Sequence, residues 1–345
     1  MKATYFTEFG GPEVFKYGDV PEPAIGPNEV LIRVRASALN HLDLWRRAGQ
    51  RGTKSSLAGP MILGCDIAGE VAETGAQVKG VAKGDRVVVN PGITCGRCDF
   101  CLSARDNMCN GYVMIGSMAN GGYAQYAKAP QENVHLLTAD LTWEEAAAMP
   151  LTFLTAYHML MTLTKLRPGE TVLIQAVGSG VGVAALQIAK LVGARTIVTA
   201  STDGKLGKAR LLGADHTINY DQHDFAARVK EITEGKGADV VFDHVGQATF
   251  EKDLQSMAKG ARFVSCGITS GYEAKLHMGV LFTKQIQLFG SYMGTKAEMG
   301  EVMRLVNQGK LRGIVSKTFE LKDAAEAHKT MESRDLFGKL VLGIP

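Results

Sequence analysis

Four cysteines lie close together in the segment "CGRCDFCLSARDNMC", which covers residues 95–109. The spacing C-x2-C-x2-C-x7-C brings their thiols within reach of one metal ion, and zinc commonly takes four thiolate ligands. Four thiolates leave no coordination position for water or substrate. A metal that reacts with substrate would need a separate site with an open position. Whether the chain has that second site decides which chemistry it performs.

A glycine-rich turn, "AVGSGVG" (176–182), lies between the apolar segment "TVLIQAV" and a helical segment. Glycines at such a turn let the backbone approach a pyrophosphate, and the helix N-terminus supplies N–H donors. The turn departs from G-x-G-x-x-G, because residue 183 is valine. Within a βαβ segment it still predicts dinucleotide binding, with a purely structural turn as the alternative. The expected contacts are Gly178, Ser179, Gly180, Val181 and Gly182.

The end of the next strand distinguishes NAD from NADP. An acidic residue there would bind the ribose hydroxyls and repel a 2′-phosphate, but "TASTDGK" places Ala200 at this point. Asp203 follows closely and favours the opposite choice. We expect NADPH, with NADH as the alternative. Four residues are candidates for contacts with the 2′-phosphate and the adenine, or else ordinary surface residues: Ser201, Thr202, Lys205 and Tyr220.

The chain changes its pattern near residue 150. Before this point, segments such as "EVLIRVRASAL" are short and alternate like half-buried strands. After it, apolar strands, glycine turns and helices alternate, which predicts a doubly wound parallel sheet of the α/β class. The last 55 or so residues resemble the first part again. We therefore expect two domains, one discontinuous (1–152 and 291–345) and one dinucleotide-binding (153–290).

Composition excludes several functions. The net charge of +3 over 345 residues is too small to indicate a nucleic-acid or membrane partner. No apolar run approaches the roughly 18 residues that a transmembrane helix requires, and the N-terminal residues lack the apolar stretch of a signal peptide. We expect a cytoplasmic enzyme that acts on a small-molecule substrate.

Four motifs together resemble the medium-chain dehydrogenase/reductase superfamily: "CGRCDFCLSARDNMC", "GGYAQYA", "AVGSGVG" and "GKLV". The resemblance covers essentially the whole chain. It implies a GroES-like β-barrel catalytic domain, a Rossmann cofactor domain and an active site in the cleft between them. In zinc-containing members the four-cysteine lobe, here residues 91–112, holds a structural zinc. The resemblance thus assigns one structural zinc to Cys95, Cys98, Cys101 and Cys109, with unmetallated thiols as the alternative.

The same resemblance locates the ligands of a catalytic zinc, and all three are changed. "SALNHLDLW" places Asn40 where the family's alcohol dehydrogenases have a cysteine, and Asp43 matches their acid three residues later. "LGCDIAG" places Cys65 in place of a histidine and Asp66 in place of a glutamate, while "MPLTFLTAY" places Leu151 at the third ligand. Because asparagine and leucine are not zinc ligands, we expect no catalytic zinc.

Without a Lewis acid, a simple alcohol or ketone is a difficult substrate, whereas a conjugated acceptor delocalises the charge into an enolate. Zinc-free members, the quinone oxidoreductases and the enone or enoyl reductases, perform this reaction with NADPH. We therefore expect NADPH-dependent hydride transfer to an activated alkene or quinone. The candidates for contact with substrate or for proton relay are Asn40, His41 and Asp43, and the candidates for nicotinamide neighbours are Thr155, Gly267 and Ser270.

Two other functions stay open. A zinc-dependent alcohol dehydrogenase with unusual ligands could use His41, Cys65 and Asp66, and a protein that binds NADPH without catalysis would have the same cofactor turn. The segment "IQLFGSYM" corresponds to the strand through which members of the superfamily pair their subunits. The resemblance therefore implies a homodimer, or a tetramer built from it.

Overall fold

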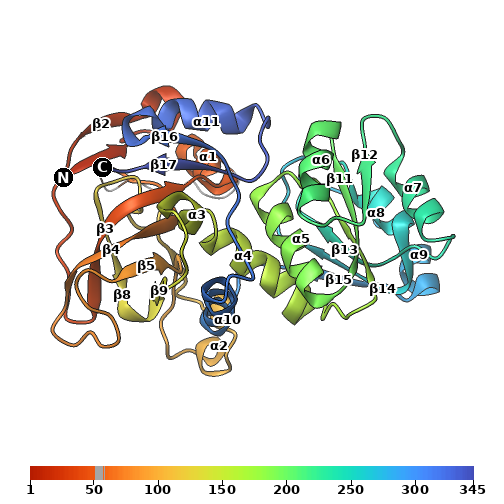
Figure 1. Ribbon diagram of the computed structural model, residues 1–345, viewed down its shortest axis with the longest axis horizontal. Coiled ribbons are helices and arrows are strands. Elements are labelled where there is room, and N and C mark those ends of the chain that lie inside the picture. The colour runs from red at the N-terminus through yellow and green to blue at the C-terminus, as the bar shows by residue number, and fades with distance from the viewer. Residues whose placement is uncertain (51–56, 58) are drawn as a thin grey trace. The chain divides into compact units, whose positions relative to one another are not determined.

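The chain divides into two units, each built on its own β-sheet (Figure 1). The computed structural model describes residues 1–50, 57 and 59–345. The first unit contains Met1–Leu151 and Thr295–Pro345, and the second contains Thr152–Gly294. The boundary at the end of the second unit, after Gly294, thus falls a few residues later in the chain than the sequence pattern indicated.

Seven strands form the main sheet of the first unit: β3 (Glu29–Ala38), β4 (Asp66–Thr74), β5 (Arg86–Val89), β8 (Tyr126–Pro130), β9 (Val134–Leu136), β16 (Val315–Glu320) and β17 (Lys339–Gly343). They follow the order β16-β17-β3-β4-β5-β9, and β8 also pairs with β3. The expected alternation in β3 is present only in part, since Val30, Ile32 and Val34 are fully buried and Arg33 is exposed, but Leu31 and residues 36–38 are buried as well. Val341 of β17 lies opposite Ala38 of β3. This pairing brings the C-terminal segment into the unit formed by the N-terminal half (Figure 1).

The other elements of the first unit are β1 (Lys2–Tyr5), β2 (Lys16–Asp19), β6 (Gly92–Ile93), β7 (Val113–Met114), α1 (His41–Ala48), α2 (Asp99–Leu102), α3 (Trp143–Ala147), α10 (Lys296–Asn307), α11 (Ala324–Glu332), and the 3-10 helices η1 (Pro12–Val14), η2 (Asp106–Met108), η3 (Gln131–Asn133) and η5 (Leu321–Asp323). Helix α11 buries Ala324, Ala327 and Met331, whose spacing of three and four residues places them on one face. That face joins the apolar core of the sheet.

Six parallel strands form the sheet of the second unit: β10 (Thr171–Ile174), β11 (Arg195–Ala200), β12 (His216–Asn219), β13 (Ala238–Asp243), β14 (Met257–Ser265) and β15 (Gln287–Gly290). Their order is β12-β11-β10-β13-β14-β15, which is that of a doubly wound fold. The helices are α5 (Gly180–Val192), α6 (Asp203–Leu211), α7 (Phe225–Ile232), α8 (Phe250–Ser256) and α9 (Met278–Lys284). Helix α4 (Pro150–Tyr157) and the π-helix η4 (His158–Leu163) precede β10.

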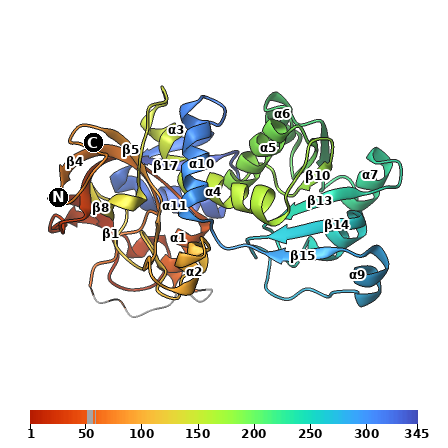
Figure 2. The same ribbon diagram turned by 90° about the horizontal axis from the view of Figure 1, so that it is seen from below.

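The strand order reverses between β10 and β13, so the carboxyl ends of these two strands flank the switch point of the sheet. Strand β14 begins at Met257, which pairs with Ala238 of β13 before the register shifts. Strand β15 forms one edge of the sheet, and Figure 2 shows it beyond β13 and β14. In the described part of the chain, no helix is long and apolar enough to span a bilayer.

Candidate active site and metal centre

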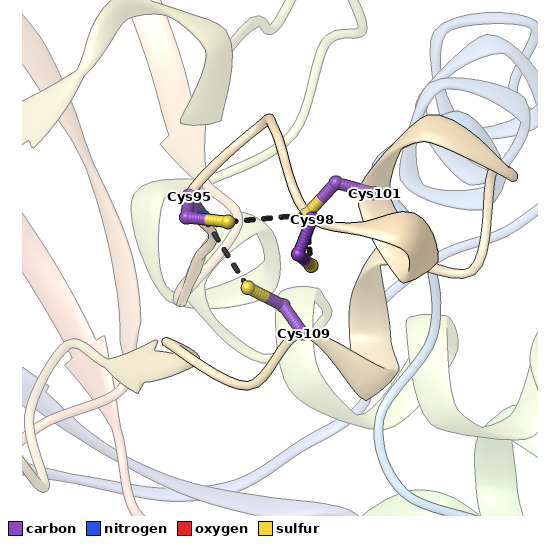
Figure 3. Close-up of side chains that lie close together, drawn as sticks. All are labelled: Cys95, Cys98, Cys101 and Cys109. Atoms are coloured by element: carbon purple, nitrogen blue, oxygen red, sulfur yellow. Dashed lines mark hydrogen bonds between the residues drawn. The ribbon is translucent and has the colours of Figure 1, made fainter.

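The cysteine cluster, Cys95, Cys98, Cys101 and Cys109, has the geometry of a metal site. All four Sγ atoms lie within 4.8 Å of one another, and Figure 3 shows them facing each other. A tetrahedron with Zn–S bonds of about 2.3 Å has edges of roughly 3.8 Å, so the spacing fits zinc. The Cys109 sulfur also accepts hydrogen bonds from the backbone N–H groups of Cys95 and Gly111, both at 3.3 Å. These N–H donors favour the thiolate form that a metal requires.

The lobe that carries the cysteine cluster is attached to the returning C-terminal segment. The carboxylate of Asp106, in η2, accepts a hydrogen bond from the backbone N–H of Lys296 at 3.2 Å. Lys296 is the first residue of α10, where an anion is favoured by the unpaired N–H groups and the helix dipole. The lobe is therefore joined to α10 through a charge-assisted contact.

Asn40, Asp66, Leu151 and Lys339 form a second polar site, which we call the Asp66 cluster. The Lys339 ammonium donates to Asn40 Oδ1 at 2.5 Å and to Asp66 Oδ2 at 2.9 Å. The Asn40 amide also donates to Asp66 Oδ2 at 2.9 Å, and the backbone N–H of Leu151 donates to Asp66 Oδ1 at 2.7 Å. Asp66 is completely buried, and Lys339 is 5% exposed. Both ends of the Asn40 side chain and both oxygens of Asp66 are thus bonded within the protein.

The backbone places Lys339 in this cluster. Gly338 has a φ of 97°, and a Cβ there would lie 2.2 Å from the carbonyl oxygen of Ile314. Only glycine fits such a position. The close approach allows the Lys339 N–H to donate to that same carbonyl at 2.8 Å, which begins β17. The side chain therefore starts from a fixed point at the strand end.

Asp43 lies in the first turn of α1 and is completely buried. Its carboxylate accepts hydrogen bonds from the N–H groups of Asn40 at 2.7 Å and Gly64 at 3.3 Å. Burial raises the pKa of Asp43 to about 7, although these N–H groups and the Lys339 ammonium oppose the rise. The residue thus fixes the turn before α1 to the segment before β4.

A chain of side chains connects Asp43 with α11. Burial and the nearby Asp43 carboxylate raise the pKa of Tyr123 well above its usual value, and the Tyr123 hydroxyl lies 3.4 Å from His328 Nε2. His328 Nδ1 lies 3.0 Å from Arg47, which forms an ion pair of 2.7 Å with Glu332. Arginine can only donate, so His328 Nδ1 accepts, and burial lowers the pKa of His328 well below its usual value. Because arginine keeps its proton, this chain positions Asp43 and does not carry protons to the surface.

His41 differs from its neighbours in exposure. It is the first residue of α1 and is half-buried, with its ring centre 6.3 Å from that of Trp45. Asn40 is 6% exposed and Asp43 is completely buried. Of the three residues expected to contact substrate or relay protons, His41 is thus the most accessible on this unit.

The glycine turn of the second unit has the shape that a dinucleotide requires. It follows β10, and Ser179 caps α5 by accepting a hydrogen bond from the Gly182 N–H at 3.0 Å. A Cβ on Gly182 would lie 2.9 Å from the Ala176 carbonyl and from Val177 Cα, so the helix begins in close contact with the turn. The N–H groups at the start of α5 are therefore presented at the switch point of the sheet.

Strand β11 ends in an alanine rather than an acidic residue. Ala200 ends the strand, and the Asp203 carboxylate accepts a hydrogen bond from the Asn219 side chain at 3.0 Å. The Thr202 hydroxyl caps α6 by accepting from the Lys205 N–H at 3.3 Å. Tyr220, just after β12, is 41% exposed. The described residues at this strand end therefore present a hydroxyl, a helix N-terminus and a lysine, while the nearby acid is bonded elsewhere.

The loops after β13 and β14 lie against each other. The Ser270 hydroxyl donates to the Val245 carbonyl at 2.7 Å, and a Cβ on Gly267 would lie 2.6 Å from the His244 carbonyl. His244 also contacts Ser179 of the glycine turn, with Nε2 2.5 Å from Oγ. Thr155 is buried, and its hydroxyl contacts the Met293 sulfur at 3.9 Å. The structure thus joins Gly267 to the switch point through His244, a residue that sequence analysis did not select, while Ser270 is bonded to the adjacent Val245.

Two family profiles match the chain. The "alcohol dehydrogenase GroES-like domain" matches residues 26–139, and the "zinc-binding dehydrogenase" matches residues 180–308. The chain belongs to the medium-chain dehydrogenase/reductase family. The expected fold class, a GroES-like domain combined with a Rossmann-type parallel sheet, and the expected enzyme class, an oxidoreductase, are confirmed.

Similar members of the family differ in the reactions that their names describe. A solved structure named an NAD-dependent alcohol dehydrogenase is 45% identical, covers 100% of both chains and superposes with a TM-score of 0.96. A quinone oxidoreductase of Pseudomonas aeruginosa is 33% identical over 99% of both chains. A 2-haloacrylate reductase of a Burkholderia species is 33% identical over 96% of both chains. Membership of the medium-chain family therefore does not by itself choose between alcohol and alkene chemistry.

The family resemblance implies two zinc sites, and the residues present fit only one. The segments aligned with a catalytic zinc site contribute Asn40, Asp66 and Leu151 to one cluster, but no oxygen of Asp66 is left without a hydrogen bond. Burial raises the pKa of the Cys65 thiol well above its usual value, which opposes the thiolate form. Among residues 1–50, 57 and 59–345, the cysteine cluster is the only group of three or more potential ligands close enough to share an ion. Membership of the medium-chain family indicates zinc and a nicotinamide cofactor. The cysteine cluster is the group of residues that fits the zinc.

Lys339 was missed as a functional candidate, although "GKLV" was recognised as a family motif. The usable signal was a lysine that begins an otherwise apolar strand, since all of Lys339–Leu342 is buried. A buried lysine nearly always has a partner. The sequence could not name that partner, because Asp66 lies far away along the chain.

Proposed function

We propose that this enzyme transfers hydride from NADPH to an activated alkene or a quinone without a catalytic zinc. One observation carries the proposal: in the Asp66 cluster an ammonium and two N–H donors occupy the acceptors that a metal would need. The names of the quinone oxidoreductase and the 2-haloacrylate reductase support it.

The chemistry follows from what the cluster lacks. A saturated ketone or alcohol needs a Lewis acid to stabilise charge on oxygen, and neutral hydrogen-bond donors do this less well. A conjugated acceptor spreads the charge over an enolate or a hydroquinone, so ordinary donors suffice. NADPH, when bound, supplies the hydride for the β-carbon, and we propose that solvent supplies the proton for the α-carbon. We propose that His41, in the first unit, donates a hydrogen bond to the substrate.

The second unit supplies the cofactor site in this proposal. The N–H groups at the start of α5 bind the pyrophosphate, and Ser179 keeps that turn in place. Ser201, Thr202 and Lys205 bind the 2′-phosphate, and Tyr220 packs near the adenine. The preference for NADPH over NADH rests on Ala200 at the end of β11 and on the Asp203–Asn219 hydrogen bond, which holds the nearby acid.

We further propose a homodimer that pairs through β15. This edge strand is largely exposed, and an unpaired edge in a soluble protein is usually covered. Large apolar residues near it are also exposed: Met278, Phe282, Leu288 and Tyr292. Sedimentation of the purified protein at micromolar concentration tests this, with a mass of two chains, or four, as the expected result.

The assay compares oxidation of NADPH with an enone, an enal, a quinone and a 2-haloacrylate against oxidation of primary and secondary alcohols with NADP. We expect turnover of at least one conjugated acceptor, unchanged by a chelator that leaves the structural zinc in place. The same acceptors with NADH should give a KM at least tenfold higher for the cofactor.

An alcohol dehydrogenase is the second candidate, because the 45% identical structure carries that name. Alcohol turnover that the chelator abolishes would establish it and overturn the zinc-free proposal. Tight NADPH binding with no turnover of any acceptor would instead identify a binding protein.

A further inference from the structure

Three buried polar side chains of the second unit connect the glycine turn with α8: Gln175 just after β10, Thr199 in β11 and Asp253 in α8, each at most 1% exposed. The Thr199 hydroxyl donates to Gln175 Oε1 at 2.6 Å, and Gln175 Nε2 donates to Asp253 Oδ1 at 2.5 Å. The Thr199 oxygen also accepts a hydrogen bond from the backbone N–H of Ala176 at 3.0 Å. We call these three side chains the Thr199 chain.

The direction of the hydrogen bonds in the Thr199 chain is fixed at the glycine turn. A backbone N–H can only donate, so the Thr199 oxygen accepts from Ala176 and the hydroxyl proton is directed to Gln175. The Gln175 amide then presents its nitrogen to Asp253. Burial and the nearby Asp243 carboxylate raise the pKa of Asp253 well above its usual value, which favours the neutral acid. Loss of one member therefore leaves a buried polar neighbour without its partner.

Ala176 is the residue through which the Thr199 chain acts on the glycine turn. Its φ of 44° lies in the left-handed region, which a residue with a Cβ rarely adopts. The Ala176 carbonyl accepts a hydrogen bond from the Ser179 N–H at 3.0 Å, and Ser179 caps α5. Another backbone conformation at Ala176 would therefore move the N–H groups at the start of α5. The hydrogen bond to Thr199 helps to hold the disfavoured conformation in place.

We propose that Thr199, Gln175 and Asp253 are positioning residues, which hold the glycine turn in the conformation that binds the cofactor without contacting the cofactor themselves. The inference rests on the cofactor site proposed above and deepens it, because it names the buried side chains on which that site depends. If a fraction of the molecules adopts another turn conformation, the apparent affinity for the cofactor falls in proportion. Hydride transfer in the bound complex should proceed at its usual rate.

Two substitutions of the same threonine test the proposal. Thr199→Val keeps the shape of the side chain and removes the hydroxyl, whereas Thr199→Ser keeps the hydroxyl. Fluorescence titration gives the Kd for NADPH and for NADH, and steady-state kinetics with a conjugated acceptor gives KM and kcat. We expect Thr199→Val to raise the Kd and KM for NADPH about tenfold, with kcat changed by less than about twofold, and Thr199→Ser to keep the wild-type values. Because both cofactors contain the pyrophosphate, their Kd values should rise by the same factor.

Thr196→Val is the matched control. Thr196 is another fully buried threonine of β11, and its hydroxyl donates to the Asp215 carboxylate at 2.9 Å and accepts from the Asp215 N–H at 3.0 Å. The control thus removes a hydroxyl with two hydrogen bonds from the same strand, at the end away from the glycine turn. Thr196→Val should lower Tm, as Thr199→Val does, and leave the Kd for NADPH unchanged.

Two results would overturn the proposal. An unchanged Kd in the folded Thr199→Val protein would show that the turn does not depend on the hydroxyl. An equal rise in Thr196→Val would show that a general loss of stability weakens binding. If Thr199→Val does not fold, Asp253→Leu and Asp253→Asn replace the pair, because asparagine keeps an acceptor oxygen for Gln175. The same Kd in these two variants would then contradict the proposal.

Failure of this inference and failure of the proposed function give different results. A wild type that binds NADPH and reduces no conjugated acceptor, together with weaker binding by Thr199→Val, would remove the proposed function and leave the role of Thr199 standing. Turnover of a conjugated acceptor with the same Kd in wild type and Thr199→Val would remove only that role. A wild type that binds neither NADPH nor NADH would overturn both.

Discussion

The two polar sites of the first unit are built in opposite ways. The cysteine cluster takes all its members from residues 95–109 and lies at the surface, with Cys95 exposed. The Asp66 cluster takes its members from four distant points of the chain, and the side chains of Asp66 and Lys339 are buried. The sulfurs of one site have the spacing that fits a metal ion, and the other site pairs a carboxylate with the ammonium of a lysine. The difference shows that a polar site can be built either within one short segment or from residues that only the fold brings together.

Loss of one cysteine tests the first half of this comparison and should have the largest effect. Cys98→Ser leaves three thiolates for zinc, and structural zinc sites contribute about 10 kcal/mol or more of folding free energy to their own segment. We expect zinc per chain to fall from one to nearly zero and residues 95–109 to become sensitive to limited proteolysis. Cys266→Ser, outside the cluster, should keep the metal. Full zinc content in Cys98→Ser would contradict the assignment.

Loss of the Lys339 ammonium tests the second half. Lys339→Met leaves the Asp66 carboxylate buried without its partner, and breaking a buried ion pair in this way costs about 3–5 kcal/mol. Urea unfolding should show this decrease in the free energy of unfolding. The control is Lys128→Met, which breaks the more exposed pair with Glu29 and should cost about 1 kcal/mol or less.

Removal of both charges separates the pair from ordinary packing. Asp66→Asn with Lys339→Met should recover part of the stability that Lys339→Met loses, because no uncompensated charge remains buried. Equal destabilisation by the single and the double variant would mean that the lysine contributes through packing of its methylene groups alone.

The same contrast explains what the sequence could predict. The cysteine spacing predicted a metal site because all of its ligands lie within one short segment. Membership of the medium-chain dehydrogenase/reductase family was predicted from motifs that are equally short. Alternation in β3 and the glycine turn before α5 predicted their elements for the same reason. Lys339 reaches its partners only because β17 pairs with β3. His244 reaches Ser179 only because β13 pairs with β10. No pattern within a short window records such pairings.

The pH dependence of stability reports on the surroundings of the Asp66 cluster. Burial raises the folded-state pKa of Asp43 to about 7, above the usual value for an aspartate. A carboxyl with a raised pKa stabilises the fold when it is protonated, so this contribution is present at pH 4 and is lost as the pH rises through 7. Asp43→Asn should therefore flatten the dependence of Tm on pH between 4 and 7.5.

The control for this measurement is Asp140→Asn, which changes an exposed carboxyl of the same unit. It should leave the pH profile of the wild type unchanged. A wild-type profile that is already flat over this range would show that Asp43 is ionised throughout, held so by the N–H groups of Asn40 and Gly64.

The attachment of the cysteine lobe to α10 should have the smallest effect. Asp106→Ala removes the carboxylate that accepts the Lys296 N–H, a loss of about 1 kcal/mol that is typical of a helix N-terminal contact. Zinc content should stay at one per chain, while hydrogen exchange at the start of α10 accelerates. Asp99→Ala, an exposed acid in the same lobe, should change neither. Loss of zinc in Asp106→Ala would mean that the lobe depends on α10 for its shape, and the cysteine cluster would then be less local than its spacing indicates.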